Sequence, residues 1–491
     1  MKPIHLFVIG VIAAGATVRA AGDLRLVDAV RSRNADAVQS LLKQRVDVNA
    51  VQGDGATALH WAAHHDDLRI ADLLIGAGAR VNAANDTGVT PLFLACTNRN
   101  AAMVERLLAA KANPNAALLN GETVLMTCSR TGEPAAVQAL LARRAAVNVK
   151  EPARGQTALM WAAAQRHPEV VRALVEHGAD VDARSRVYQQ TVTSEVTQRA
   201  AREELNYTVA RGGSTPLLFA ARVGDAESAR ILLEAGADVN DSFPDGISAL
   251  TAAAHSGQQA VGILLLEKGA DPNAAAGGYT ALHAAVLRNG LDLVKALLAH
   301  GANPNASITR GTPVRRNSED FELPATLVGA TPYLLAARFL EVDIMRVLAA
   351  GGADPRRPMK TGATPLMAAA GLGASAQTDR RGLSALDGGK VEDEGRVLDA
   401  TRAALELGGD VNAMSDMGDT ALHAAAALGY NTVVQFLADH GAQLNAKNKR
   451  GQTALAAIAG RQGDGATATD RASQAPRQST VDLLRSLGAN D

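Results

Sequence analysis

The chain has little of what most enzymes use for chemistry. Its 491 residues include 2 cysteines and 2 tryptophans, and aromatic residues make up 3%. The sequence contains no HExxH, GxSxG, Walker A or CxxC motif, which are common signatures of catalytic, nucleotide and metal sites. The formal net charge of -1 argues against a general nucleic-acid binder, which needs a basic surface. We therefore predict no catalytic residues, no cofactor, no metal site and no nucleic-acid partner.

Long apolar runs are also missing, with one short exception at the start. Lys2 gives a positive beginning, residues 6–16 are apolar, and Val18-Arg19-Ala20 supplies small residues where a signal peptidase cleaves. This run is too short for a membrane span. The pattern predicts a secretory signal peptide over residues 1–20, with an uncleaved N-terminal anchor as the alternative. The mature chain would then have no membrane span and would be exported, to the periplasm or out of the cell.

What the chain does have is one motif in many copies. Thr followed by Pro or Ala and then Leu recurs about every 33 residues, with small variations in each letter. The copies begin at Thr57, Thr90, Thr123, Thr157, Thr215, Ser248, Thr280, Thr331, Thr364, Thr420 and Thr453. A period in this range indicates stacked repeats.

A glycine follows most copies in fixed phase, as at Gly178 and Gly301. Between the two markers lie two short segments with helical apolar spacing, for example 157–164 and 169–177. Thr can cap the first helix, and Gly can end the second in a left-handed conformation. The Asp- and Asn-rich residues after each Gly suit a tight turn.

These motifs resemble the ankyrin-repeat family over nearly the whole chain. Thr280-Ala281-Leu282-His283-Ala284-Ala285 with Gly301 matches that family's pattern almost letter for letter, and residues 420–425 with Gly441 do the same. The resemblance implies a helix–turn–helix unit and a β-turn finger in each repeat. It also implies a concave face of fingers and first helices that binds proteins. We expect an all-α solenoid of about 12 repeats, a single domain over 23–491 with a degenerate first copy as cap.

Four insertions interrupt the spacing. Those at about 188–211 and 311–328 follow a helix pair and belong to the finger region, whereas those at about 372–394 and 462–477 separate the two helices of one repeat. Within the first, residues 194–206 predict a short helix. The second reads as an irregular loop, and the last two, rich in small and polar residues, as mobile segments. Their length leaves both functional loops and neutral expansion open.

Two repeats depart from the glycine pattern. Lys111 and Arg144 stand where the other copies have Gly. A left-handed conformation costs such a residue on the order of 1 kcal/mol. We therefore expect a weaker stack around residues 105–150.

The two cysteines occupy equivalent places in adjacent first helices. Packed helices lie about 8–10 Å apart, while a disulfide needs Cα atoms within about 7 Å. This comparison favours two buried free thiols at Cys96 and Cys128. An oxidising compartment leaves a disulfide between repeats as the alternative.

Most histidines have structural explanations. Three follow the capping residue by three positions, where the family uses His to tie the turn, and three precede the helix-ending Gly, where a cation complements the helix dipole. The first group is His60, His283 and His423; the second is His177, His300 and His440. The run His64-His65-Asp66-Asp67 has no further ligand specified by the sequence, so we assign it no metal.

A basic row near the end of the first helices is a candidate binding surface. It lies seven or eight residues after the capping position and consists of His64, His65, Arg130, Arg222, His255, Arg288 and Arg338. Trp61 and Trp161 would flank it as anchors, or simply pack against neighbouring helices. The row could recognise an acidic partner segment, or it could only complement helix dipoles.

Together these patterns predict an exported, non-catalytic, monomeric scaffold that binds another protein. Alternatives are a toxin-neutralising or enzyme-associated regulatory module and a secreted, host-directed effector. Repeat scaffolds are generic, so the sequence does not identify the partner.

Overall fold

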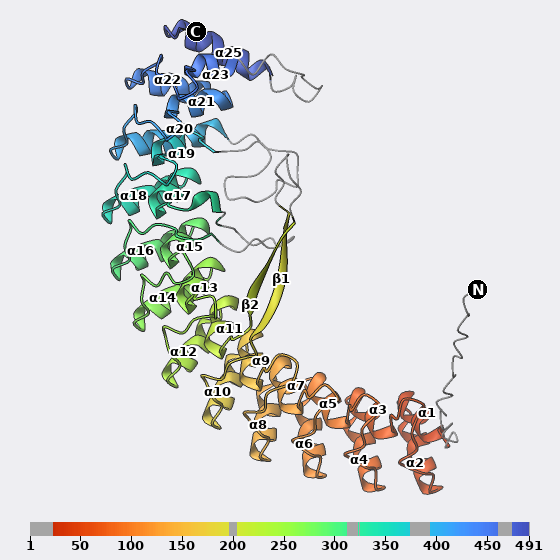
Figure 1. Ribbon diagram of the computed structural model, residues 1–491. Coiled ribbons are helices and arrows are strands. Elements are labelled where there is room, and N and C mark those ends of the chain that lie inside the picture. The colour runs from red at the N-terminus through yellow and green to blue at the C-terminus, as the bar shows by residue number, and fades with distance from the viewer. Residues whose placement is uncertain are drawn as a thin grey trace, which may run out of the picture. The chain divides into compact units, whose positions relative to one another are not determined.

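The computed structural model describes residues 23–195, 204–311, 323, 325–373, 393–459 and 474–490. The chain divides into two compact units, residues 1–152 and 153–491 (Figure 1). The predicted signal peptide lies outside the described residues. Within them, no helix has the length and apolar composition that crossing a membrane requires. The prediction of a single solenoid over 23–491 stays a prediction, and each unit is described by itself below.

The first unit consists of four helix pairs. Its helices are α1 (Arg25–Arg31), α2 (Ala35–Lys43), α3 (Ala58–His64), α4 (Leu68–Gly76), α5 (Pro91–Thr97), α6 (Ala101–Ala109), α7 (Val124–Thr131) and α8 (Pro134–Ala142). First helices pack on first helices and second helices on second helices, as in the α3–α5 and α6–α8 contacts. The unit is therefore a stack of identical two-helix layers, as the repeat spacing predicts.

The second unit continues the same pattern with a β-hairpin and longer connections. Its elements are α9 (Ala158–Ala164), α10 (Pro168–Glu176), β1 (Tyr188–Glu195), β2 (Glu204–Arg211), α11 (Pro216–Val223), α12 (Ala226–Glu234), α13 (Ala249–His255), α14 (Gln259–Glu267), α15 (Ala281–Leu287), α16 (Leu291–Ala299), η1 (Ala325–Leu327), α17 (Pro332–Arg338), α18 (Val342–Ala350), α19 (Pro365–Ala369), α20 (Glu394–Glu406), α21 (Ala421–Leu428), α22 (Asn431–Asp439), α23 (Ala454–Ala459) and α25 (Gln474–Ser486). The fold is the all-α, ankyrin-type stack that the motifs predict.

The capping residues start the first helices as predicted. Thr123 Oγ1 accepts the backbone N–H of Met126 at 3.3 Å, and Thr331 Oγ1 accepts that of Leu334 at 3.2 Å. Three of the four second helices in the first unit use Asx caps, as where Asp67 accepts the N–H of Ile70 at 2.8 Å, whereas α8 begins with Pro134 and has no side-chain cap. Each cap satisfies an N–H group that the helix cannot, which stabilises short helices of seven to nine residues.

Small and branched apolar residues form the core between layers. Ala62, Ala63 and Ala95 are fully buried, as are Leu59 and Leu74. Each buried Leu contributes about 1.5–3 kcal/mol relative to exposure. The Ala pairs keep neighbouring first helices close, which leaves room for few aromatic side chains.

Left-handed residues end both helices of a repeat. Gly178 has φ 82, and Lys111 and Arg144 adopt φ 71 and 62 at the equivalent place, so the predicted left-handed site is confirmed for both departures. A second left-handed site, in the turn between the helices, is occupied by Gly132 in one repeat and Arg99 in another. The sequence reasoning above overlooked this second register.

The fingers, the segments between the second helix of one repeat and the first helix of the next, stack through their backbones. The N–H of Asp86 donates to Asp54 O at 2.9 Å, and that of Lys449 donates to Met417 O at 2.9 Å. A Cβ on Gly418 would lie 2.9 Å from the Cα of Asn448, so the glycine two residues before each capping residue permits this close approach.

In most repeats, an Asn four residues after the helix-ending residue links consecutive repeats. Asn82 Oδ1 accepts the N–H of Asn113 at 2.7 Å, and its Nδ2 donates to Lys111 O at 3.1 Å. Asn273 makes the same two bonds in the second unit, to Asn303 N and Gly301 O. The sequence alone suggested only a local turn former here, because the partner lies in the next repeat.

The prediction of a helix over 194–206 is wrong at both ends, where the chain is β-strand; residues 196–203 lie outside the described residues. Residues 188–195 and 204–211 form an antiparallel pair with Tyr188 opposite Arg211 and Glu195 opposite Glu204. Fingers already bring two antiparallel arms together, as the isolated bridge between Ser242 and Ser248 shows, and the insertion lengthens those arms (Figure 1). The β-branched residues at both ends of the insertion, such as Thr191 and Thr208, were the overlooked signal.

The prediction of free cysteines is also wrong. Cys96 and Cys128 form a disulfide with a Cα–Cα distance of 4.7 Å. The 8–10 Å spacing that argued against it is measured between helix axes. Each Cα lies about 2.3 Å off its axis, so two residues on facing sides are several ångströms closer than the axes. The bond joins α5 to α7 inside the first unit.

The other insertions are described only in part. In the second, Ala325–Leu327 forms a 3-10 turn and Leu323 is buried, while the remainder lies outside the described residues. Helices α20 and α25 have 13 residues each and begin at Glu394 and Gln474, within or at the edge of the third and fourth insertions. The expectation that those two insertions are mobile concerns residues that are otherwise not described.

Candidate protein-binding surface

The exposed large apolar side chains of the described residues all belong to fingers. They are Leu119, Val149, Val187, Tyr188, Met414 and Met417, with Leu119 the most exposed at 80%. Val187 and Tyr188 lie where a finger runs into β1. Surface apolar groups at loop tips cost solubility and contribute nothing to the core, which makes them candidate contacts for a partner.

In the first unit, the structure brings Trp61, His64 and His65 together. The indole N–H of Trp61 donates to Gln52 Oε1 at 2.9 Å, and both imidazole rings lie within 5.7 Å of the indole. Trp61 is half-buried, so part of the indole faces solvent.

Two arginines complete this group, which we name the Trp61 cluster (Arg31, Arg33, Trp61, His64 and His65). The Arg31 guanidinium lies 5.6 Å from the indole centroid, and Arg33 Nη2 donates to His65 Nδ1 at 3.2 Å. Sequence reasoning missed both arginines because the first repeat is degenerate. Arg31 lies one period of 33 residues before His64, so the repeat spacing also indicates this arginine.

Charge crowding affects one member of the Trp61 cluster. Burial, with the nearby positive charges of Arg33 and His64, lowers the pKa of His65 below its ordinary value. The lowered pKa favours the neutral form of the His65 ring, whereas the guanidinium groups of Arg31 and Arg33 stay charged.

Arg130 lies at the end of α7 in the first unit and does not belong to the Trp61 cluster. Its guanidinium pairs with Glu122 at 3.4 Å with 43% of its side chain exposed. An exposed pair of this kind contributes little stability, so Arg130 remains accessible to a partner.

In the second unit, the basic row serves mainly to bind helix ends. Arg288 Nε donates to His255 O, at the end of α13, and Arg338 donates to the carbonyls of Leu372 at 3.4 Å and Gly373 at 3.1 Å. These bonds satisfy orphan carbonyls of the neighbouring repeat and agree with the dipole interpretation of the row.

The remaining predicted residues of this unit are His255, Arg222 and Trp161. His255 Nδ1 lies 3.4 Å from the hydroxyl of Tyr279, Arg222 is exposed at the end of α11, and Trp161 is half-buried in α9. The structure thus groups His255 with Arg288, and it places Trp161, Arg222 and Arg338 in other repeats.

The two groups of structural histidines behave as predicted. His283 Nδ1 accepts the N–H of Thr280 at 3.2 Å, so Nε2 carries the proton and donates to Ala330 O at 3.3 Å in the next repeat. His60 and His423 make equivalent bonds. His177, His300 and His440 each bond the carbonyl four residues earlier, at 2.7–2.8 Å.

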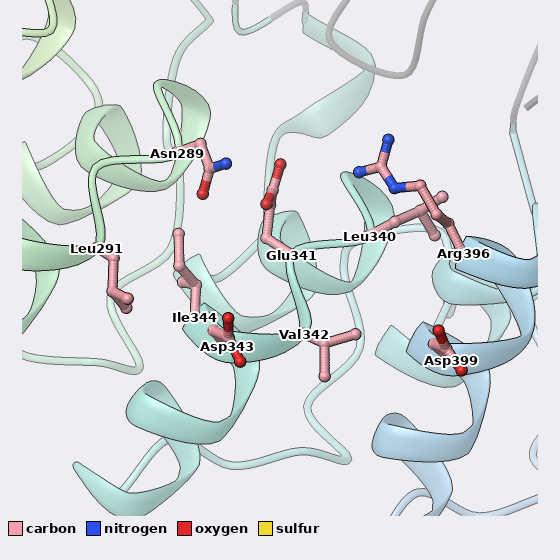
Figure 2. A pocket seen from close by; sticks show the side chains of 9 residues that line it. All are labelled: Asn289, Leu291, Leu340, Glu341, Val342, Asp343, Ile344, Arg396 and Asp399. Carbon is pink, nitrogen blue, oxygen red and sulfur yellow. The ribbon is translucent and has the colours of Figure 1, made fainter. Parts of the chain in front are cut away.

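A pocket of about 510 Å³ lies at the inter-helix turns of the second unit, at the end of the helix pairs away from the fingers. Asn289 and Leu291, the segment 340–344, and Arg396 with Asp399 of α20 face it (Figure 2). It mixes carboxylates and one guanidinium with aliphatic side chains. Among the described residues, no three His, Cys, Asp or Glu side chains are grouped to hold a metal ion.

Stacked helix pairs, backbone-linked fingers and exposed apolar tips define a repeat scaffold of the protein-binding class. The family model for ankyrin repeats, three copies long, matches residues 26–117, 101–185, 217–308 and 394–490, which is more than half of the chain. The chain belongs to the ankyrin-repeat family. Ankyrin repeats generally mediate protein–protein interaction and are typically non-catalytic, so those coarse features of the predicted function hold.

Individual relatives share only part of their length with this chain. An ankyrin repeat-containing protein of Treponema pallidum (strain Nichols) is 42% identical over 125 residues, 24% of this chain and 41% of that protein. The B-cell lymphoma 3 protein homolog of Mus musculus is 34% identical, over 23% of this chain and 29% of its own. The E3 ubiquitin-protein ligase KEG of Arabidopsis thaliana is 24% identical, over 50% and 16%.

Among solved structures, the human ASB11 ankyrin repeat domain is 28% identical with a TM-score of 0.41, covering 50% of this chain and 98% of that one. The chain spans less than half of the length of the Treponema pallidum, Mus musculus and Arabidopsis thaliana proteins. Nothing about their wider activities follows for this chain.

Proposed function

We propose that this chain is an exported, non-catalytic, monomeric scaffold that binds another protein through its fingers and the adjoining ends of its first helices. The observation that carries the proposal is the placement of exposed apolar side chains. Leu119, Met414 and Met417 are 80%, 50% and 49% exposed, and all three belong to fingers. The buried centre of a protein interface is more apolar than the rest of the surface and is enriched in methionine.

Two features support export. Residues 1–20 have the pattern of a signal peptide. The disulfide between Cys96 and Cys128 fits an oxidising compartment, because cytosolic thiols are kept reduced.

Fractionation of the producing cells tests the export proposal. We expect the chain in the periplasm or culture medium, lacking residues 1–20 by mass spectrometry and oxidised at both cysteines. A chain that stays in the cytosol with residues 1–20 attached contradicts it. Recovery inside a host cell would instead favour the effector alternative.

Affinity capture from an envelope extract tests the binding proposal. The bait is residues 21–491, whose monomeric state light scattering checks, compared with a finger variant carrying Leu119→Ser, Met414→Ser and Met417→Ser. A matched variant changes exposed residues of second helices, Lys295→Ser and Arg230→Ser. A partner retained by the matched variant and lost from the finger variant supports the proposal; retention by both contradicts it.

A further inference from the structure

We infer that three consecutive fingers near the end of the second unit form a docking surface for an acidic protein segment that carries apolar side chains. The inference rests on the proposed function, that fingers bind another protein, and adds the chemistry of the partner. The surface, named here the basic finger patch, consists of Arg356, Arg357, Lys360, Met414, Met417, Lys447, Lys449 and Arg450.

The cations of the patch are exposed and come from its outer two fingers. Arg356, Arg357 and Lys360 lie between α18 and α19, and the other three lie between α22 and α23. The middle finger, between α20 and α21, carries the two methionines. A partner that crosses all three fingers therefore meets positive charge, an apolar centre and positive charge again.

Backbone contacts hold the three fingers in one surface. The N–H of Asp416 donates to Thr361 O at 2.9 Å, and the N–H of Lys449 donates to Met417 O at 2.9 Å. A Cβ on Gly362 would lie 2.6 Å from Asp416 N, so these two fingers are in direct backbone contact. The spacing of charges is thus set by the stack, which lowers the entropy lost on binding.

The three fingers carry six cations against four carboxylates, those of Asp354, Asp410, Asp416 and Asp419, so the patch keeps a net positive charge. Among the described residues, the three lysines and three arginines of the patch take part in no ion pair. Arg356 is the exception in being partly engaged, because its Nε donates to Gly408 O at 2.6 Å. Of the nearby carboxylates, Asp419 accepts from Asn448 Nδ2 at 2.9 Å, and Asp416 is exposed.

The concentration of cations is local. The whole chain has a net charge of -1, and a finger earlier in the same unit carries Asp238, Asp241 and Asp245 instead. Six cations on two fingers of a nearly neutral chain are therefore a local cluster of positive charge. A local positive surface speeds encounter with an acidic segment and selects against basic ones.

The methionines indicate that the partner is a protein segment with apolar residues. Met414 and Met417 are 50% and 49% exposed, and flexible thioether side chains adapt to varied apolar partners. Single-stranded nucleic acid would instead need aromatic side chains for stacking, and these three fingers contain no Phe, Tyr or Trp.

Fluorescence anisotropy with short labelled peptides tests the inference on residues 21–491. The acidic probe alternates Glu with Leu and Gly; one control replaces its Leu by Ser, another replaces its Glu by Lys, and an oligothymidylate of equal charge is the third. The patch-reversal variant combines Arg357→Glu, Lys360→Glu, Lys447→Glu, Lys449→Glu and Arg450→Glu. The matched control reverses exposed cations of second helices in the same unit, Lys268→Glu, Lys295→Glu and Arg346→Glu.

We expect the acidic probe to bind in a salt-sensitive way, with affinity reduced by at least about tenfold in the patch-reversal variant and unchanged in the matched control. Met414→Ser with Met417→Ser should weaken the Leu-containing probe several-fold and leave the Ser-containing one unaffected. Circular dichroism confirms that each variant is folded.

Equal binding by wild type and the patch-reversal variant overturns the inference, as does tighter binding of the oligothymidylate than of the acidic probe. The proposed function fails separately, when no captured partner depends on any finger. A captured partner that depends on Leu119 but binds the patch-reversal variant normally would overturn this inference and leave the proposed function standing.

Discussion

The two units differ in the residues that occupy the left-handed positions of their turns. Among the described residues, the first unit has six left-handed residues that are not glycine, among them Arg45, Lys111 and Arg144, whereas the longer second unit has three, Arg166, Asn289 and Leu340. Each such residue costs on the order of 1 kcal/mol. The first unit therefore starts from weaker local turns than the second.

The disulfide is found in the unit with the less favourable turns. Cys96 and Cys128 join α5 to α7, on either side of the repeat boundary that contains Lys111. A covalent link between layers stabilises against unfolding without requiring good turns, because it restricts the unfolded chain. The second unit, with glycine at most turns, has no cysteine at all. Backbone strain in one unit thus coexists with a covalent link that offsets it.

The largest expected effect comes from removing that link. Cys96→Ala with Cys128→Ala should destabilise the first unit by about 3–4 kcal/mol, since the bond closes a loop of 32 residues. The chain has one Trp in each unit, so Trp161→Phe leaves Trp61 as a reporter of the first unit and Trp61→Phe leaves Trp161 for the second. Urea unfolding followed by fluorescence should shift only for the Trp61 reporter. Equal shifts for both reporters would contradict a role confined to the first unit.

The second prediction concerns acid. Burial lowers the pKa of His283 from 6.5 to about 4. Between these values the unfolded chain binds a proton that the folded chain excludes, so the free energy of unfolding of the second unit falls as pH drops from 6.5 to 4, by about 3 kcal/mol. The Trp161 reporter measures this loss, and NMR of the His283 ring gives its midpoint directly.

His283→Asn is the control for this second prediction, because its side-chain oxygen can still accept the Thr280 N–H. The acid-dependent loss should be smaller in this variant than in wild type by the same amount. An NMR midpoint near 6.5 would show that burial does not act as described.

The third prediction exchanges the turn chemistry of the two units. Lys111→Gly and Arg144→Gly should each stabilise the first unit by about 1 kcal/mol, because glycine adopts the left-handed conformation without a Cβ clash. Gly236→Lys is the mirror change in the second unit and should destabilise it by a similar amount. An added Cβ at Gly236 meets no atom within 4 Å, so only backbone conformation is tested. Opposite signs in urea unfolding confirm the comparison, whereas two changes of the same sign contradict it.

The smallest effect is expected at the surface of the first unit. Arg31→Ala removes the guanidinium over the Trp61 indole and should cost about 0.5–1 kcal/mol. Arg31→Lys should keep part of that contribution, and the Trp61 reporter detects both. No change in either variant would mean that the contact contributes nothing to folding.

The candidate surface was only partly predictable. The period located Trp61, His64 and His65 in one row, and the structure places them in contact. The period did not show that Arg288 and Arg338 bind carbonyls of neighbouring repeats. The partner of a side chain across a repeat boundary depends on how the layers are offset. The sequence did not identify the exposed apolar side chains of the fingers as candidate contacts, because an apolar residue in a turn can be buried or exposed and its spacing does not show which.

The sequence by itself determined the repeat unit, its helices, the capping Thr, the left-handed Gly and the structural histidines. Each of these depends on residues within a few positions of one another, where helical spacing and capping chemistry act locally. Only the tertiary structure decided that Cys96 and Cys128 are bonded, that residues 188–195 pair with 204–211 and that Asn82 links two repeats. These depend on distances between facing layers, which are set by side-chain packing across the stack.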